Sequence, residues 1–380
     1  MKIVFTGGGT GGHFYPIIAV AEKVNEIVDN ENIIGPKLYY ISNNPYDKEV
    51  LFENGLLYEE IHAGKMRTYF SLKNFFLNFI DSFKMLFGII NSVFKMFSIY
   101  PDVVFGKGGY ASFPTIFAAR ILRIPVVIHE SDSAPGRVNK WAGHFAKRVA
   151  ISFEEASTYF PVEKVAWTGQ PIRTEIEHPA LKSDALEYFK LESNLPVIFI
   201  IGGSQGAELI NNTILDALPR LLKNYQVIHQ TGVRNFKTVV GRAEVILSDN
   251  KDKARYISIP FLNPLAMKMA AGAATLIISR AGSTLFEIAS WGVPSILVPF
   301  AESNADHSKQ NAFNYARSGA CSVVEEMNMA TNILSSEIDR IIGDRTVYEK
   351  MAQNAKAFSK PDAAMKIARE LINIALSHEE

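Results

Sequence analysis

Short apolar runs alternate with longer segments of helical periodicity along most of the chain. Several runs are rich in valine and isoleucine without a polar residue at every second position, as in parallel strands buried on both faces. This alternation predicts doubly wound parallel sheets joined by crossover helices, an α/β fold. We expect strands at residues 3–6, 38–42, 103–105, 126–129 and 148–152, and a second series at 197–201, 226–230, 256–259, 275–279 and 295–299.

Two series of strands indicate two domains, because 380 residues exceed what one hydrophobic core usually serves. A residue before a proline is pushed out of helical geometry, so the segment that ends at Pro171 suits a connection between domains. We therefore assign residues 1–168 to an N-terminal domain and residues 169–360 to a C-terminal domain. Residues 361–380 are expected to form a helix that packs back on the N-terminal domain.

Three of the apolar runs lead directly into glycine-rich loops, at residues 7–13, 106–110 and 202–207. Each loop precedes a segment that can form a helix. Glycine lets the backbone approach a phosphate group, and the free N–H groups of the following helix face the anion. Three such loops in two distant regions predict two α/β units that face a shared, nucleotide-type ligand.

Residues 69–100 form an amphipathic stretch in which phenylalanine recurs among leucine, isoleucine and methionine. Lysines recur on its polar stripe at a spacing of about three helical turns. One interpretation is a crossover helix whose apolar face lies in the core of the first domain. The other is peripheral docking to an anionic membrane surface, and we adopt it as a hypothesis. The side chains expected at the headgroup boundary are Phe75, Phe76, Phe79 and Phe83.

Charge and composition narrow the class of protein. Lysine plus arginine equals aspartate plus glutamate, 39 each, which argues against broad nucleic-acid binding. The single cysteine, Cys321, excludes an intrachain disulfide and is expected to be a small buried residue near a strand. We find no signal-peptide pattern and no charge-free apolar stretch of membrane-spanning length. No metal-binding signature is present either, so no metal and no cofactor are predicted.

His13 stands where the first glycine loop becomes a helix. Glycines 7, 9 and 12 formally match a dinucleotide fingerprint, but the expected second strand is followed by Asn43 and Asn44 and not by the required carboxylate, which argues against an NAD site. A helix N-terminus disfavours imidazolium, so His13 is a candidate general base. The alternative is a histidine that merely satisfies a hydrogen bond.

Three candidate binding residues further along the chain each have a structural and a ligand-binding interpretation. Ser204 either caps a helix or donates to a phosphate. Glu287 either complements a helix dipole or accepts both hydroxyls of a ribose. Arg173, just past the domain boundary, is either a solvated surface residue or a partner for a leaving diphosphate.

The order of these motifs resembles the MurG family of peptidoglycan N-acetylglucosaminyl transferases, in the GT-B superfamily. The likeness runs nearly end to end. It is carried by residues 8–13 with Pro16, 106–114, 129–132, 139–141, 169–173, 202–207, 280–287 and 361–363.

The resemblance implies a fold of two doubly wound, Rossmann-like domains facing a cleft. It implies transfer of GlcNAc from UDP-GlcNAc to the C4 hydroxyl of undecaprenyl-linked lipid I, with inversion, giving lipid II for peptidoglycan synthesis. It also implies a peripheral protein on the anionic cytoplasmic face of the cell membrane.

Site residues follow from the resemblance as well. His13 would be the base for the acceptor hydroxyl, Leu262 would contact uracil through its backbone, and Glu287 would bind the ribose. Ser308 stands where the family has a glutamine that contacts GlcNAc hydroxyls, and His307 or Gln310 are alternatives there. The implied donor site comprises Thr10, Gly11, Gly12, Arg173, Ser204, Leu262, Ser283, Thr284, Glu287 and Ser308. The implied acceptor diphosphate loop comprises Gly106, Gly108, Gly109 and Tyr110.

Two other functions remain open at this point. A UDP-GlcNAc 2-epimerase shares the two-domain plan and needs neither a lipid acceptor nor a membrane segment. A non-catalytic nucleotide-sugar-binding protein at the membrane would bind the donor without turnover.

Overall fold

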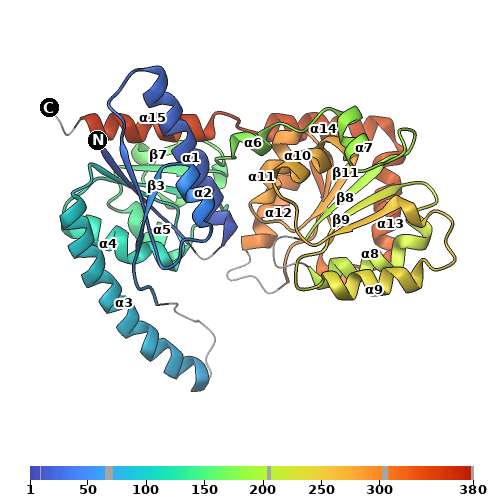
Figure 1. The fold of residues 1–380 in the computed structure, drawn as a ribbon, viewed down its shortest axis with the longest axis horizontal. Helices are drawn as coiled ribbons and strands as arrows, with labels where there is room; N and C mark the ends of the chain where they lie inside the picture. The colour runs from blue at the N-terminus through green and yellow to red at the C-terminus, as the bar shows by residue number, and fades with distance from the viewer. Residues whose placement is uncertain (9, 65–71, 203–206, 302–306, 378–380) are drawn as a thin grey trace. The chain divides into compact units, whose positions relative to one another are not determined.

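The computed structural model describes the chain apart from residues 9, 65–71, 203–206, 302–306 and 378–380, and of residues 72–76 it describes the backbone alone. The chain divides into two compact units (Figure 1). The first unit comprises Met1–Arg173 with Lys360–Glu380, and the second comprises Thr174–Ser359. Each unit is built on its own parallel sheet.

The sheet of the first unit has the strand order β3-β2-β1-β4-β5-β6-β7. Its strands are β1 (Lys2–Thr6), β2 (Lys37–Ser42), β3 (Leu56–Glu60), β4 (Val103–Gly106), β5 (Val126–Glu130), β6 (Arg148–Ile151) and β7 (Val165–Trp167). From β1 the chain adds strands first in one direction and then, from β4 onward, in the other. The order therefore reverses between β1 and β4.

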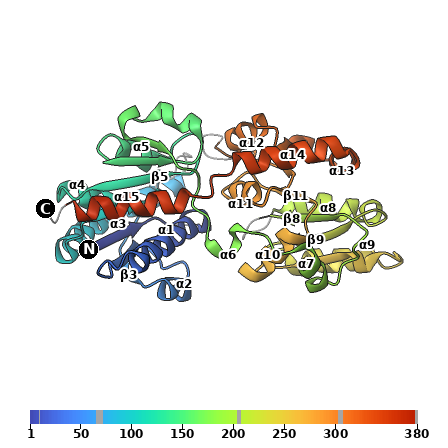
Figure 2. The ribbon, with the colours of Figure 1, turned by 90° about the horizontal axis from the view of Figure 1, so that it is seen from above.

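Alternate residues of β1 pack into two separate cores, because successive side chains of a strand point to opposite faces. Ile3 and Phe5 pack with helices α1 and α15, which lie side by side (Figure 2). Val4 packs on the other face with residues of α3, α4 and α5. The helices of this unit are α1 (Gly11–Asn30), α2 (Lys48–Glu53), α3 (Leu72–Ile99), α4 (Phe113–Ile121), α5 (Arg137–Gly143) and α15 (Ala363–Leu376).

The second unit repeats the plan with the strand order β10-β9-β8-β11-β12-β13. Ile198 and Ile200 pack into one core, and Phe199 packs into the other. Its strands are β8 (Val197–Ile201), β9 (Gln226–Gln230), β10 (Tyr256–Ile259), β11 (Leu276–Ser279), β12 (Ser295–Leu297) and β13 (Cys321–Val323). Its helices are α6 (Thr174–Glu177), α7 (Lys182–Tyr188), α8 (Glu208–Leu221), α9 (Phe236–Ile246), α10 (Pro264–Ala273), α11 (Thr284–Trp291), α12 (His307–Arg317), α13 (Thr331–Gly343) and α14 (Arg345–Phe358).

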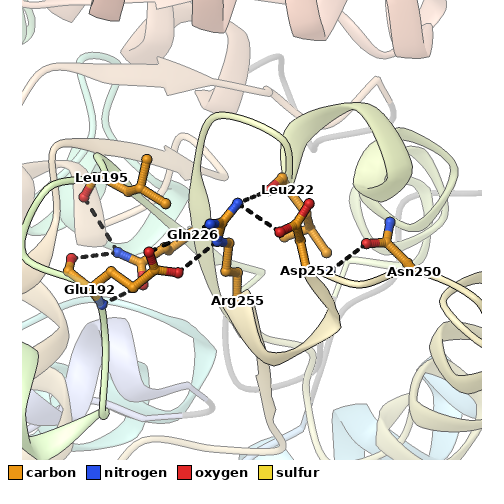
Figure 3. Close-up of polar contacts among 7 residues, drawn as sticks. All are labelled: Glu192, Leu195, Leu222, Gln226, Asn250, Asp252 and Arg255. Atoms are coloured by element: carbon orange, nitrogen blue, oxygen red, sulfur yellow. Dashed lines mark hydrogen bonds and ion pairs between the residues drawn. The ribbon is translucent and has the colours of Figure 1, made fainter.

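A polar cluster fixes the segment before β8 against β9 and β10 (Figure 3). The buried Gln226 side chain accepts from the Glu192 N–H (2.7 Å) and donates to the Glu192 carbonyl (2.8 Å). Arg255 donates to the Glu192 carboxylate (2.7 Å) and to the Leu222 carbonyl (2.9 Å), and it pairs with Asp252 (3.0 Å). Because the buried Gln226 amide is bonded through both its oxygen and its nitrogen, it ties Glu192 to β9.

Every predicted strand is present, with ends that differ by at most two residues. Strands β3, β7 and β13 were not predicted, and all three lie at a sheet edge, as the predicted β10 also does. These three strands carry polar or exposed residues, so they lack the continuous apolar run of a central strand. Cys321 lies on β13 and is buried, which confirms the prediction of a small buried residue near a strand, and burial raises the pKa of its thiol.

The first unit extends to Arg173 and therefore includes residues 169–173, which the sequence analysis assigned to the other domain. Hydrogen bonds to the first sheet explain the difference. The Gly169 N–H donates to the Ile151 carbonyl (3.1 Å), and the Gly169 carbonyl accepts from His129 Nε2 (2.9 Å). The segment after β7 is thus bonded to β5 and β6.

Candidate active site

Two of the glycine loops leave neighbouring strands of the first sheet. The loop before α1 follows β1, the loop at residues 106–109 follows β4, and the strand order reverses between these two strands. In open α/β sheets, ligands bind at the carboxyl ends of the strands at such a reversal. The two loops therefore mark the expected binding position of this unit.

The two loops approach each other closely. Gly109 has a φ of +79°, and a Cβ atom there would lie 3.1 Å from the Gly8 carbonyl and 3.5 Å from His13 Nε2 and Cε1. Gly108 has a φ of +87°, and a Cβ atom there would lie 2.8 Å from Asn139 Nδ2. Backbone conformation and space both require glycine here. The structure thus brings His13 together with the predicted acceptor loop.

His13 lies in the first turn of α1 and is partly buried. Burial, followed by the charge of Lys107, lowers the pKa of its imidazole to about 4, whereas Asp132 acts in the opposite direction. Thr10 Oγ1 lies 3.0 Å from His13 Nδ1. A neutral ring that donates its Nδ1–H to Thr10 presents an unprotonated Nε2, which is what a general base requires.

The remaining predicted residues of this unit are arranged around these loops. Thr10 is exposed, and Gly11 and Gly12 are partly exposed. The Tyr110 hydroxyl accepts from Asn43 Nδ2 (3.3 Å). The guanidinium of Arg173 lies 3.8 Å above the ring of Tyr15, which follows His13 closely on α1.

A polar network behind the loops was not assigned any role by the sequence analysis. Glu130, at the end of β5, accepts from the N–H groups of Asp132 (2.9 Å) and Gly136 (3.0 Å) and from Asn139 Nδ2 (2.9 Å). Lys107 is 2 % exposed and donates to Ser131 Oγ. Lys107, Glu130 and Ser131 lie at or directly after the end of a strand, and that position is the signal in the sequence that could have found them.

In the second unit the strand order reverses between β8 and β11. The loop after β8 contains Ser204, which lies outside the described residues. The loop after β11 leads into α11 with an accessible start: a Cβ atom on Gly282 would meet nothing within 4 Å, and Ser283 and Thr284 are partly exposed. Glu287, in the first turns of α11, is partly exposed as well.

Two residues predicted to bind the nucleotide sugar, Leu262 and Ser308, already make hydrogen bonds within the protein. The Leu262 N–H donates to Gln230 Oε1 (3.1 Å), so its backbone contact with a base would require Gln230 to move or would use the carbonyl. Ser308 Oγ accepts from the Phe300 N–H (3.1 Å) and keeps its own proton to donate. Gln310, the alternative at this position, is exposed, and His307 is partly exposed.

Helix α3 turns its described phenylalanines toward solvent. Phe79, Phe83, Phe87, Phe94 and Phe97 are between 50 and 71 % exposed. The buried face instead consists of Asp81, Gly88, Ser92 and Met96. The described phenylalanines therefore lie outside the core, whereas Met96 is buried in it and Val93 and Ile99 pack against it, so the crossover-helix interpretation holds for part of this helix.

The charged groups of α3 are largely paired. Lys84 pairs with Asp81 (3.5 Å), and Lys95 pairs with Glu59. By length and composition alone, Leu77–Ile99 is apolar enough to cross a membrane, which the sequence analysis did not expect because it required a stretch without charge. The side chains of Phe75 and Phe76 lie outside the described residues.

Among the described residues, no group of three or more His, Cys, Asp or Glu side chains has the arrangement of a metal site.

Comparison with known protein families assigns both halves of the chain to the same family. Residues 3–151 match the glycosyltransferase family 28 N-terminal domain, and residues 197–367 match the glycosyltransferase family 28 C-terminal domain. The chain belongs to glycosyltransferase family 28.

Family 28 relatives match over nearly the full length. A protein of Pediococcus pentosaceus is 33 % identical over 96 % of this chain and 97 % of its own length, and one of Limosilactobacillus reuteri is 32 % identical over 100 % of both chains. Both are named UDP-N-acetylglucosamine–N-acetylmuramyl-(pentapeptide) pyrophosphoryl-undecaprenol N-acetylglucosamine transferase.

Solved structures agree on the fold of this family 28 chain. MurG of Acinetobacter baumannii has a TM-score of 0.73 at 24 % identity and covers 98 % of this chain and 99 % of its own. The UDP-GlcNAc 2-epimerase of Neisseria meningitidis has a TM-score of 0.65 at 18 % identity and covers 98 % of this chain and 100 % of its own. The two parallel α/β units are those of the GT-B fold.

Proposed function

We propose that this chain transfers GlcNAc from UDP-GlcNAc to the C4 hydroxyl of lipid I, with inversion, and thereby makes lipid II for peptidoglycan synthesis. The observation that carries the proposal is the full-length likeness, at 33 % identity, to a relative named for this transfer. The glycine loops and the neutral His13 support it from the chemistry of the chain itself.

The reaction is a single displacement. The acceptor C4 oxygen forms a bond to the anomeric carbon of GlcNAc, the bond from that carbon to the UDP phosphate oxygen breaks, and the electron pair leaves with UDP. His13 Nε2 accepts the proton of the attacking hydroxyl, and Thr10 orients the ring through Nδ1. Attack from the side opposite UDP inverts the anomeric centre.

The two units have different roles in this proposal. The second unit binds the donor: Glu287 accepts from the ribose hydroxyls, Leu262 contacts uracil, and Ser283 and Thr284 border the nucleotide. Arg173 and Ser204 stabilise the diphosphate, while Thr10, Gly11 and Gly12 border the transferred sugar. Ser308 donates to a GlcNAc hydroxyl, since its oxygen already accepts from Phe300. The first unit binds the acceptor diphosphate through Gly106, Gly108, Gly109 and Tyr110.

We also propose that the exposed face of α3 docks on the cytoplasmic face of the membrane that holds the lipid acceptor. Exposed aromatic and aliphatic side chains along one helix face suit the headgroup boundary. Because Lys84 and Lys95 are paired, we expect apolar contact to contribute more than attraction to anionic lipid.

Flotation with anionic liposomes tests the docking surface. The triple variant Phe79→Ser, Phe83→Ser, Phe87→Ser should lose most of its binding, while Phe52→Ser, an exposed phenylalanine on α2, should bind like the unaltered chain. Equal binding of the triple variant and the unaltered chain would remove α3 from the docking surface.

Transfer of labelled GlcNAc onto a lipid I analogue tests the activity. We expect labelled GlcNAc to be transferred. Unlabelled UDP-GlcNAc should compete strongly with the labelled donor, whereas UDP-GalNAc and UDP-glucose should compete only weakly. Release of ManNAc from UDP-GlcNAc without acceptor would instead identify an epimerase. Binding of UDP-GlcNAc without any turnover would identify a non-catalytic nucleotide-sugar-binding protein.

A further inference from the structure

Lys107 is a charged side chain that the proposed mechanism does not use, although it lies beneath the site. Its backbone N–H donates to the Thr6 carbonyl at the end of β1 (2.8 Å), and its side chain is buried. A Cβ atom on Gly7 would lie 3.1 Å from Lys107 Cβ and 3.7 Å from the His13 carbonyl oxygen. Lys107 therefore packs against the first glycine loop, next to the helix that carries His13.

The ammonium group belongs to a chain of hydrogen bonds along the carboxyl edge of the first sheet. Lys107 Nζ donates to Ser131 Oγ, and Ser131 donates to Gln170 Oε1 (2.8 Å). Ser152 donates to the same Gln170 oxygen (3.0 Å). Because the Ser131 proton is directed to Gln170, the serine oxygen is left to accept from Lys107, which fixes the position of the positive charge.

A buried ammonium group requires negative charge in its surroundings. Burial lowers the pKa of Lys107 to about 8, while Glu130 and Asp132 act in the opposite direction, so the group stays mainly charged at pH 7. Both oxygens of Glu130 already accept N–H bonds from its own loop. The Glu130 carboxylate is therefore partly engaged by these N–H groups. A bound anion would stabilise the ammonium group of Lys107 further.

We propose that Lys107 is a positioning residue whose buried positive charge attracts the acceptor's diphosphate to the two glycine loops and disfavours a second positive charge on His13 until that diphosphate is bound. The inference rests on the proposed function of the first unit as the acceptor site.

The groups that face His13 support this role. Burial lowers the pKa of His13 most, and the charge of Lys107, from the loop after β4, lowers it further. The charge of Asp132, from the loop after β5, raises this pKa. Thr10 is the hydroxyl partner at Nδ1. A negative charge bound at the glycine loops would offset the effect of the Lys107 charge on the pKa of His13. His13 would therefore have a higher pKa, and be a stronger base, once the acceptor is bound.

The first test uses the unaltered chain and inorganic pyrophosphate as the probe. The ring of His13 is titrated by NMR without and with saturating pyrophosphate. We expect its pKa to rise by about one unit, a tenfold change in proton affinity. An unchanged pKa in the presence of pyrophosphate would overturn the proposal. The measurement needs no turnover, so absence of GlcNAc transfer would count against the proposed function alone.

The second test uses Lys107→Gln, which keeps a donor for Ser131 and removes the charge, with the exposed Lys147→Gln as its control. We expect kcat/KM for a lipid I analogue to fall by about tenfold and its acid limb to move to higher pH, with KM for UDP-GlcNAc unchanged. The limb of kcat, which reports the substrate complex, should move less. An acid limb of kcat/KM identical to that of the unaltered chain would overturn the proposal. Should the variant not fold, the pyrophosphate titration decides.

Discussion

The carboxyl edges of the two sheets differ in their chemistry although their topology is alike. In the first unit, ionisable side chains gather at the edge: Lys107, His129 and Glu130 are all buried there, beside the partly buried His13. In the second unit, the loop before α11 begins with the buried Arg280, which is paired with Glu326 (2.5 Å), and then offers small residues and backbone, with Glu287 on the helix that follows. The shared fold thus carries two different electrostatic designs.

This difference teaches where proton chemistry is possible. Buried ionisable groups shift one another's pKa values, as Lys107 does for both His13 and His129. Neutral donors and a helix N-terminus bind anions and hydroxyls without exchanging protons. We therefore expect changes at the first edge to affect turnover and changes at the second edge to affect donor binding.

The largest expected effect is that of His13→Ala. Removal of a general base should lower kcat by about 10²–10⁴ and leave the affinity for UDP-GlcNAc nearly unchanged. Both quantities are measured, by the transfer assay and by calorimetric titration of the donor. His144→Ala, an exposed histidine near α5, serves as the control. An unreduced rate in His13→Ala would mean that proton transfer occurs elsewhere.

Glu287→Ala should produce the opposite pattern. Loss of charged hydrogen bonds to the ribose costs about 1.5–3 kcal/mol, which corresponds to roughly a tenfold to hundredfold weaker Kd for UDP. The KM for the acceptor should stay the same. Calorimetry with UDP alone measures the effect, and Glu244→Ala, an exposed acid on α9, is the matched control. If both variants bind UDP equally well, Glu287 does not contact the nucleotide.

The central strands could be predicted because each is a continuous apolar run, buried on both faces. Strands β3 and β7 could not be predicted in this way, because they lie at the ends of the first sheet and expose much of their sequence. Helix α3 was predicted as a helix, but the direction of its apolar face could not be read from periodicity. That direction follows from Gly88, where a Cβ atom would collide with the His62 carbonyl, a contact between residues far apart in the chain.

The parts of the candidate site that one short motif contains could be proposed from the sequence. His13 and the glycine loops are local features, and the structure brings them together across β1 and β4. The hydrogen bonds from Lys107 to Ser131 and from Ser131 to Gln170 join residues that follow three different strands, β4, β5 and β7. Nothing in a lysine between glycines indicates that its side chain is buried, so this network required the structure.

The smallest expected effect is on the pH dependence of the stability of the second unit. Its measurement tests whether this unit also contains a group that titrates on unfolding. His229 is fully buried on β9, with Nε2 2.9 Å from Asn211 Oδ1 and Nδ1 3.0 Å from the Tyr256 hydroxyl. Burial lowers its pKa to about 3. Between this value and the unfolded value near 6.5, the unfolded state binds more protons, so stability is lost as the pH falls through that window.

One such histidine accounts for at most about 2 kcal/mol of lost stability between pH 6.5 and pH 5. In His229→Gln this contribution disappears, so the free energy of opening of β8 and β9 should vary less with pH than in the unaltered chain. The variant should also be less stable at pH 7, because Asn211 and Tyr256 lose a hydrogen-bond partner. Hydrogen exchange of the β8 and β9 amides, corrected for intrinsic rates, measures this in the second unit alone, apart from His13 and His129 in the first. The same pH dependence in both proteins would mean that His229 does not titrate on unfolding, and the contrast between a titrating first edge and a neutral second sheet would then be complete.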